Sequence, residues 1–170
     1  MALRGSVAPL DRLYGCLPYL LPMSAAVFYG VFLFGQFPPL ATIFFPLIWL
    51  KFLLGFPIIP QVISLDFVVF ICVYMFVVRN ERVNHFVRFN AMQALLLGIV
   101  LVLIQILVSL LQPALPSASS QALIFVVQIF ANTIFVGMMA ACGFSIFQSI
   151  RGLYAEMPIV SEAAYYQVRF

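Results

Sequence analysis

The sequence predicts an all-α, polytopic membrane protein with four transmembrane helices and one short additional helix. Of the 170 residues, 65% are hydrophobic and only 8% are charged, and the mean hydropathy is +1.17. A soluble domain usually has about 25% charged residues, because charge covers its water-exposed shell. Long apolar stretches also follow one another along the chain, and basic residues gather between them. Residues 1–170 are therefore expected to form a single membrane domain.

The apolar stretches place the four transmembrane spans at residues 13–35, 59–78, 86–111 and 121–150. Each approaches or exceeds the length of about 20 residues that a spanning helix needs. A fifth stretch, residues 40–54, has fifteen residues and contains Pro46. It is too short to span, so we expect an interfacial or re-entrant helix whose Lys51 side chain extends to the lipid headgroups.

The distribution of basic residues predicts the orientation of the spans. Apart from Lys51, they lie before the first span, between the second and third spans, and after the fourth: Arg4, Arg12, Arg79, Arg82, Arg88, Arg151 and Arg169. By the positive-inside rule, these three segments share one side of the membrane, which we call the cis side. The uncharged connection 112–121 then lies on the opposite, trans side. Because Arg12 and Arg79 lie on the same side, the chain must cross the membrane an even number of times between them, so residues 40–54 do not cross. Residues 151–170 then form a cis-side tail.

Several polar residues lie inside the apolar stretches. Asp66 either reaches water or headgroups near the trans interface or marks a functional site, since a carboxylate is costly in hydrocarbon. No Lys or Arg lies within one helical turn of it. The third span carries Gln105 and Ser109 on one face, followed by Gln112, and the fourth carries Gln121, Gln128 and Asn132. We expect these faces to meet each other or a hydrated cleft, because amides in hydrocarbon need partners; helix packing is favoured over a conduit.

The first turns of the third span also carry polar side chains. Arg88 can extend to the cis interface, whereas Asn90 and Gln93 are too short and should bond to other helices.

The sequence lacks a convergent set of catalytic or metal-binding residues, and we expect no catalytic residue, no metal and no cofactor. His85 is the sole histidine and has no second ligand at a matching spacing. Asp66 and His85 would lie about 28 Å apart along a helix that rises about 1.5 Å per residue, so a Ser-His-Asp arrangement fails. Without a clustered basic patch, nucleic acid is not expected as a partner.

Two longer motifs are specific. Residues 77–95 have the sequence VVRNERVNHFVRFNAMQAL, and residues 151–169 have the sequence RGLYAEMPIVSEAAYYQVR. Together with Asp11-Arg12-Leu13 and the Gln36-Phe37-Pro38-Pro39 turn, they resemble the Tic-twenty family, which is named after a subunit of the chloroplast inner-envelope protein translocon and has cyanobacterial relatives. The resemblance implies a multi-pass protein of that envelope or of a cyanobacterial membrane, with both termini on the stromal or cytoplasmic side.

The resemblance also implies a function and partners. It suggests a subunit that helps preproteins cross, with the lipid bilayer, other membrane subunits and a transiting polypeptide as partners. The motif residues expected to form a cis-side interaction surface are Arg79, Asn80, Arg88, Asn90, Gln93, Pro158, Ser161 and Glu162. If the tail folds back, Arg79 and Arg88 can pair with Glu156 or Glu162. Gly98 stands where the family often has an acid, which argues against an acid-lined path there.

Two other functions remain open on the sequence alone. A small-solute or ion channel would need charged groups facing a cavity, and Asp66 is the candidate for that role. The other is a structural or assembly factor for other membrane complexes, which stable copurification with a photosynthetic or respiratory complex would favour.

Overall fold

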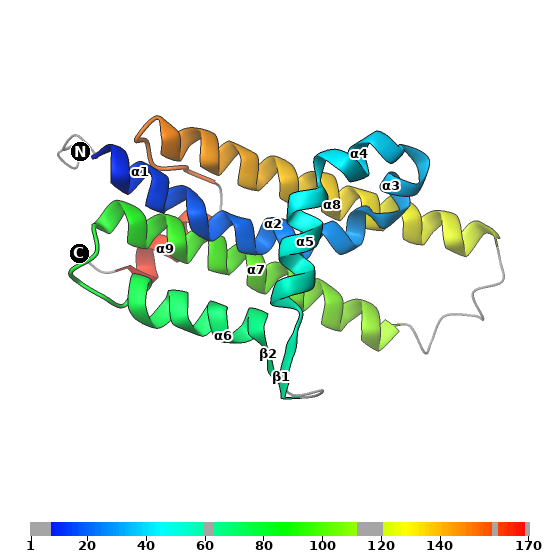
Figure 1. Cartoon of the computed structure of the whole chain (residues 1–170), viewed down its shortest axis with the longest axis horizontal. Helices are drawn as coiled ribbons and strands as arrows, with labels where there is room; N and C mark the ends of the chain where they lie inside the picture. Colours follow the sequence, from blue (N-terminus) through cyan, green and yellow to red (C-terminus); the bar gives the residue numbers. More distant parts are fainter. Residues whose placement is uncertain (1–7, 60–62, 112–120, 158–159, 169–170) are drawn as a thin grey trace.

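The computed structural model describes residues 8–59, 63–111, 121–157 and 160–168. These residues are helical apart from one short hairpin and the connecting segments, which confirms the all-α class (Figure 1). In the described part of the chain, three helical segments are long and apolar enough to cross a membrane: Pro9–Gln36, His85–Leu111 and Leu123–Ile150.

The N-terminal segment is one rod with alternating helix types. It consists of α1 (Pro9–Cys16), η1 (Leu17–Tyr19), α2 (Leu20–Ala26), η2 (Val27–Gly30) and α3 (Val31–Gln36). Pro18 lies in η1 and Pro22 in α2. Proline lacks the N–H that an α-helix needs, so the chain tightens locally into 3₁₀ turns without ending the rod.

The next two helices are short and leave the direction of the rod. They are α4 (Pro38–Ile43) and α5 (Phe45–Leu54). Pro46 lies in the first turn of α5, where a missing N–H is tolerated. In Figure 1, α5 runs crosswise to the long helices, and it packs against α2. The range 40–54, expected to form one short helix, is thus divided between two, α4 and α5.

A short antiparallel hairpin follows, made of β1 (Pro57–Ile59) and β2 (Ile63–Ser64). It precedes α6 (Leu65–Cys72), which continues as the π-helical segment η3 (Val73–Val78). The helix expected over 59–78 thus begins at Leu65, where the Ser64 Oγ accepts a hydrogen bond from the Phe67 N–H as an N-cap. At about 1.5 Å per residue, Leu65–Val78 extends over about 21 Å, less than the hydrocarbon core of about 30 Å.

The remaining helices are α7 (His85–Leu111), α8 (Gln121–Ile150) and α9 (Val160–Gln167). The N-terminal rod packs against both α7 and α8 and separates them over much of their length. One buried cluster, which includes Tyr19, Phe135 and Cys142, joins the rod, α7 and α8. A second, which includes Phe89 and Ala164, joins α7, η3 and α9. Both described chain ends and the connection from η3 to α7 lie at one end of the bundle (Figure 1). This end is called the cis end, and the opposite end the trans end.

Candidate functional site

A buried polar junction joins three helices near the cis end. Tyr19 of η1, Asn90 and Gln93 of α7, and Ser149 of α8 have no exposed surface. The Tyr19 hydroxyl lies 3.0 Å from Asn90 Oδ1 and 2.9 Å from Gln93 Oε1, so its single O–H is shared between two acceptors. The Ser149 Oγ donates to Asn90 Oδ1 over 2.8 Å. This confirms the expectation that Asn90 and Gln93 bond to other helices.

The same junction holds the C-terminal tail. Gln93 Nε2 donates to the Ala155 carbonyl over 2.9 Å and lies 3.3 Å from the Ser161 Oγ. The Ser161 Oγ donates to the Ala155 carbonyl and accepts from the Met157 N–H. A hydroxyl has one donor and two acceptor sites, so Ser161 uses all of them. Pro158, another residue of the expected interaction surface, lies outside the described residues.

Aromatic side chains cover the junction on the tail side. The Tyr154 ring packs edge-to-face on Phe86 and Phe89, with centroids 5.4 and 5.2 Å apart, and Tyr165 lies 4.5 Å from Phe89. The Tyr154 hydroxyl is 3.1 Å from His85 Nδ1. Burial, together with the nearby Tyr165 hydroxyl, raises the pKa of Tyr154. These contacts fold the tail back onto α7.

Arg88, one of the charged residues of the expected cis-side surface, faces into the bundle. Arg88 Nε donates to the Val78 carbonyl over 2.9 Å, where η3 ends and a carbonyl lacks a helical partner. The expected pairing of Arg88 with Glu156 or Glu162 is therefore wrong, because α7 directs Arg88 toward η3 instead of the tail. Among the described residues, no ion pair joins Arg79 to either glutamate.

The connection from η3 to α7 contributes the remaining residues of that surface. Asn80 Oδ1 accepts from the Arg82 N–H over 3.0 Å and so shapes a turn. Arg79 and Glu162 are exposed. Of the expected cis-side residues, Asn90, Gln93 and Ser161 thus lie in the buried junction, and Arg79 and Glu162 remain available at the surface.

A second polar site lies beyond the junction, toward the trans end. The Lys51 ammonium group of α5 pairs with the Asp66 carboxylate at the start of α6, and their side chains are 15% and 28% exposed. The Lys51 Nζ also lies 5.8 Å from the centroid of the Phe28 ring. The Lys51 side chain, which was expected to extend to the headgroups, thus has a partner within the chain. No basic residue lies within one helical turn of Asp66, but the hairpin between α5 and α6 reverses the chain and brings residues 51 and 66 together.

This ion pair borders a cavity of about 600 Å³. The wall opposite Lys51 and Asp66 comes from α7 and includes Gly98, Gln105 and Ser109. A Cβ added to Gly98 would meet nothing within 4 Å, so the cavity has room beside that position. Three of the predicted intramembrane polar residues, Asp66, Gln105 and Ser109, are thus brought to one place.

The polar faces of α7 and α8 do not meet each other, which was one of the two expected arrangements. The Ser109 Oγ donates to the Ile106 carbonyl of its own helix over 2.8 Å. Within the described segments, no hydrogen bond joins Gln105 or Ser109 to Gln128 or Asn132, and the buried Asn132 Oδ1 has no partner. The reason is the N-terminal rod, which packs between the two helices. The other stripe residue of α7, Gln112, lies outside the described residues.

These features define a class of protein: a multi-pass helical membrane protein with a buried polar junction at one end and a charged cavity between its helices. Within the described segments, no group of three or more His, Cys, Asp or Glu residues could hold a metal ion. The chain belongs to the Tic20 family, since the family model described as "Chloroplast import apparatus Tic20-like" matches residues 10–164. The resemblance inferred from the two motifs is confirmed.

Individual relatives come from a cyanobacterium and from plants. A protein of Synechocystis sp. named "Tic20 family protein" is 41% identical over the full length of both chains. Two Arabidopsis thaliana proteins, "Protein TIC 20-v, chloroplastic" and "Protein TIC 20-II, chloroplastic", are each 30% identical. The first match covers 96% of this chain and 73% of the relative, and the second covers 91% and 70%. The chain is thus an integral membrane protein of a family with chloroplast and cyanobacterial members.

Proposed function

We propose that this chain is a membrane subunit of a Tic-type protein translocon. It helps preproteins cross the chloroplast inner envelope, or serves an equivalent role in a cyanobacterial membrane, together with other membrane subunits. The observation that carries the proposal is the cavity bordered by Lys51, Asp66 and Gln105. A polypeptide in transit exposes backbone N–H and C=O groups, which need polar partners at a depth where lipid supplies none. The cavity offers an ammonium, a carboxylate and an amide to meet them.

The proposal includes a topology of four crossings with both termini on the stromal or cytoplasmic side. The crosswise direction of α5 supports a helix that does not cross (Figure 1). Leu65–Val78 is short for a crossing helix, and the β1–β2 hairpin precedes it toward the trans side. Irregular backbone at membrane depth is tolerated where it lines a cavity, and Ser64 of the hairpin lines a second cavity beside Asp66.

Cysteine labelling tests this topology. In a chain whose three native cysteines are replaced, single cysteines at Arg82 and Tyr166 should react with an impermeant reagent from the same side. A cysteine at Ile58 should react from the opposite side. Labelling of Ile58 from the same side as Arg82 would contradict four crossings.

Photocrosslinking tests the role of the cavity. A photoreactive residue at Gln105 should crosslink to a preprotein arrested during transit. The same residue at Val126, which is exposed on α8 away from the cavity, should crosslink to lipid only. Equal crosslinking at both positions, or none at Gln105 during active transit, would contradict the proposal.

The ion pair also favours a second candidate function, a small-solute or ion channel, because a charged pair lines the cavity. Reconstituted conductance that changes with Asp66→Asn and needs no polypeptide would support this alternative. The proposed translocon role instead predicts that an arrested preprotein changes any such conductance.

The outward-facing cis residues are the proposed contact with other subunits. Arg79 and Glu162 are exposed, and Tyr166 is 85% exposed on α9. A charge reversal at Arg79 should weaken assembly on native gels and leave membrane insertion intact. Stable copurification with an unrelated membrane complex, lost in the same variant, would favour the assembly-factor alternative.

A further inference from the structure

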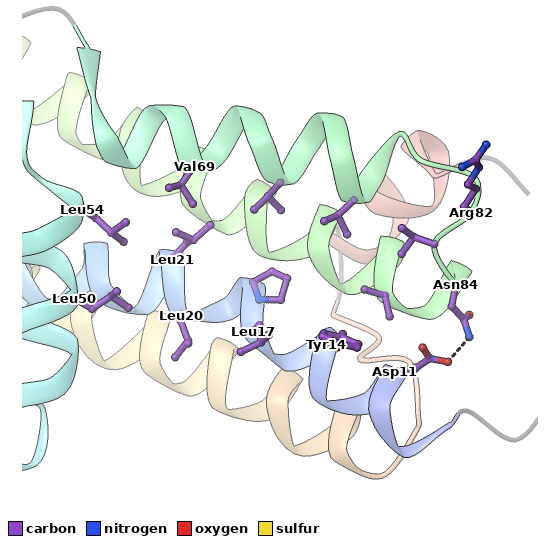
Figure 2. A pocket seen from close by; sticks show the side chains of 15 residues that line it. Asp11, Tyr14, Leu17, Leu20, Leu21, Leu50, Leu54, Val69, Arg82 and Asn84 are labelled. Atoms are coloured by element: carbon purple, nitrogen blue, oxygen red, sulfur yellow. Dashed lines mark hydrogen bonds between the residues drawn. The ribbon is translucent and has the colours of Figure 1, made fainter. Parts of the chain in front are cut away.

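An apolar groove of about 610 Å³ lies on the face of the bundle between the N-terminal rod and the α6–η3 segment (Figure 2). Leu17 and Leu21 line it from the rod, and Val69 and Val73 line it from the opposite side. Its volume falls within the range of about 300 to 1,000 Å³ that is typical of small-ligand sites. It is separate from the ion pair, since neither Lys51 nor Asp66 lines it.

The two ends of the groove differ in chemistry. At the trans end, Leu50 and Leu54 of α5 lie across it, so the crosswise helix closes it with hydrocarbon (Figure 2). At the cis end, the lining residues are polar and include Asp11, Arg82 and Asn84. The groove thus has an apolar interior and one polar mouth, located where the bundle meets the cis membrane surface.

The length of the groove restricts its occupant. Its α6–η3 wall extends over about 21 Å at about 1.5 Å per residue, and α5 closes it well short of the about 30 Å hydrocarbon core. A transmembrane helix of about 20 residues would be stopped by α5. A lipid acyl chain from one leaflet needs only about half the core thickness, so it fits with its headgroup at the mouth.

The charges at the mouth indicate the headgroup. Asn84 Nδ2 donates to Asp11 Oδ2 over 2.7 Å, so one carboxylate oxygen already has a partner and is held on the rod side (Figure 2). Arg82 is exposed on the opposite rim, and in the described part of the chain its guanidinium has no ion-pair partner. Guanidinium matches phosphate oxygens in charge and geometry.

We propose that this groove binds one anionic phospholipid of the cis leaflet. An acyl chain lies between the rod and the α6–η3 wall, and the phosphate contacts Arg82. Bound in this way, the lipid fills the groove between the rod and the α6–η3 segment and so holds that segment in place.

Native mass spectrometry of the full chain, released from nanodiscs of equal anionic and zwitterionic phospholipid, tests the proposal. The wild-type chain should retain one lipid, enriched several-fold in the anionic species. Val73→Trp should fill the groove and lose the lipid, whereas Val126→Trp, the same change on an exposed position of α8, should retain it. Leu50→Trp at the closed end provides a second groove-filling variant if Val73→Trp does not fold.

Two further variants separate the headgroup from the acyl chain. Arg82→Gln should still retain a lipid but lose the preference for the anionic species. Arg79→Gln, a neighbouring exposed arginine that does not line the groove, should keep that preference. Retention of lipid in both groove-filling variants would overturn the proposal, as would crosslinking of a transiting preprotein, instead of lipid, to a photoreactive residue at Val73.

Discussion

Gln93 Nε2 donates a 2.9 Å hydrogen bond to the carbonyl of Ala155, 62 positions further along the chain. The bond is fully buried, and through it α7 holds the tail that follows α8. The other end of the same amide accepts from Tyr19, so one side chain joins the first helical rod, the central helix and the tail.

Replacing Gln93 with Leu should release the tail. The substitution removes the buried hydrogen bonds of Gln93 to the Ala155 carbonyl and the Tyr19 hydroxyl, each worth about 0.5–1.5 kcal/mol. The Ala155 carbonyl keeps its bond from the Ser161 hydroxyl, and the Tyr19 hydroxyl keeps Asn90 as an acceptor. We expect faster protease cleavage of residues 151–168 and a lower free energy of unfolding in mixed micelles. Gln128→Leu is the matched control, since Gln128 makes no hydrogen bond to α7 in the described structure; an equal loss in both variants would contradict this role.

The Lys51–Asp66 pair should show strong coupling in a double-mutant cycle. Asp66→Asn or Lys51→Met alone leaves one charge without its partner in a mostly apolar setting, and each should destabilise the chain by about 1.5–3 kcal/mol. The double variant should lose less than the sum of the two single variants. Simple additivity, measured by unfolding in the same micelles, would show that the pair contributes no specific interaction.

Two Gly→Ala substitutions should have opposite effects. Gly152 has φ +71° and follows α8, with the Gly152 and Leu153 N–H groups bonded to the carbonyls of Ser149 and Gln148 as in a Schellman motif. Gly152→Ala should destabilise by about 1 kcal/mol or more, because alanine disfavours positive φ and its Cβ would lie 3.1 Å from Arg12 Nε. Gly137→Ala, inside α8 with open space around it, should stabilise by about 0.5–1 kcal/mol.

Alkaline pH should undock the tail. Tyr154 and Tyr165 lie outside the spans, and burial raises the pKa of each above its ordinary value of 10. The folded state therefore favours the neutral hydroxyl, so this stabilisation is complete below about pH 10 and is lost as the pH rises through the raised pKa. Protease sensitivity of the tail should increase above pH 10. The Tyr154→Phe, Tyr165→Phe double variant should shift that increase to higher pH or abolish it.

Local properties of the sequence predicted much of the molecule. Three of the four expected spans match helices of spanning length, and the polar side chains of Asn90 and Gln93 bond across helices. The segment 40–54 is helical but is divided between α4 and α5. The helix α6 begins at Leu65, six residues after the start predicted at residue 59. The capping role of Ser64 could have indicated it, because a serine followed by an apolar helical run is a typical helix start.

The sequence by itself determined that this is a membrane protein, that it belongs to its family, and which segments carry positive charge. Hydropathy, motifs and charge placement depend on residues that are near one another in the sequence. They are therefore the same whichever way the helices pack. Only the tertiary structure decided that Lys51 meets Asp66, that Tyr19 shares its hydroxyl between Asn90 and Gln93, and that the N-terminal rod keeps the polar faces of α7 and α8 apart. Hydropathy shows that a helix is buried in lipid or protein, but which of its faces meets which neighbour depends on packing between residues far apart in the chain.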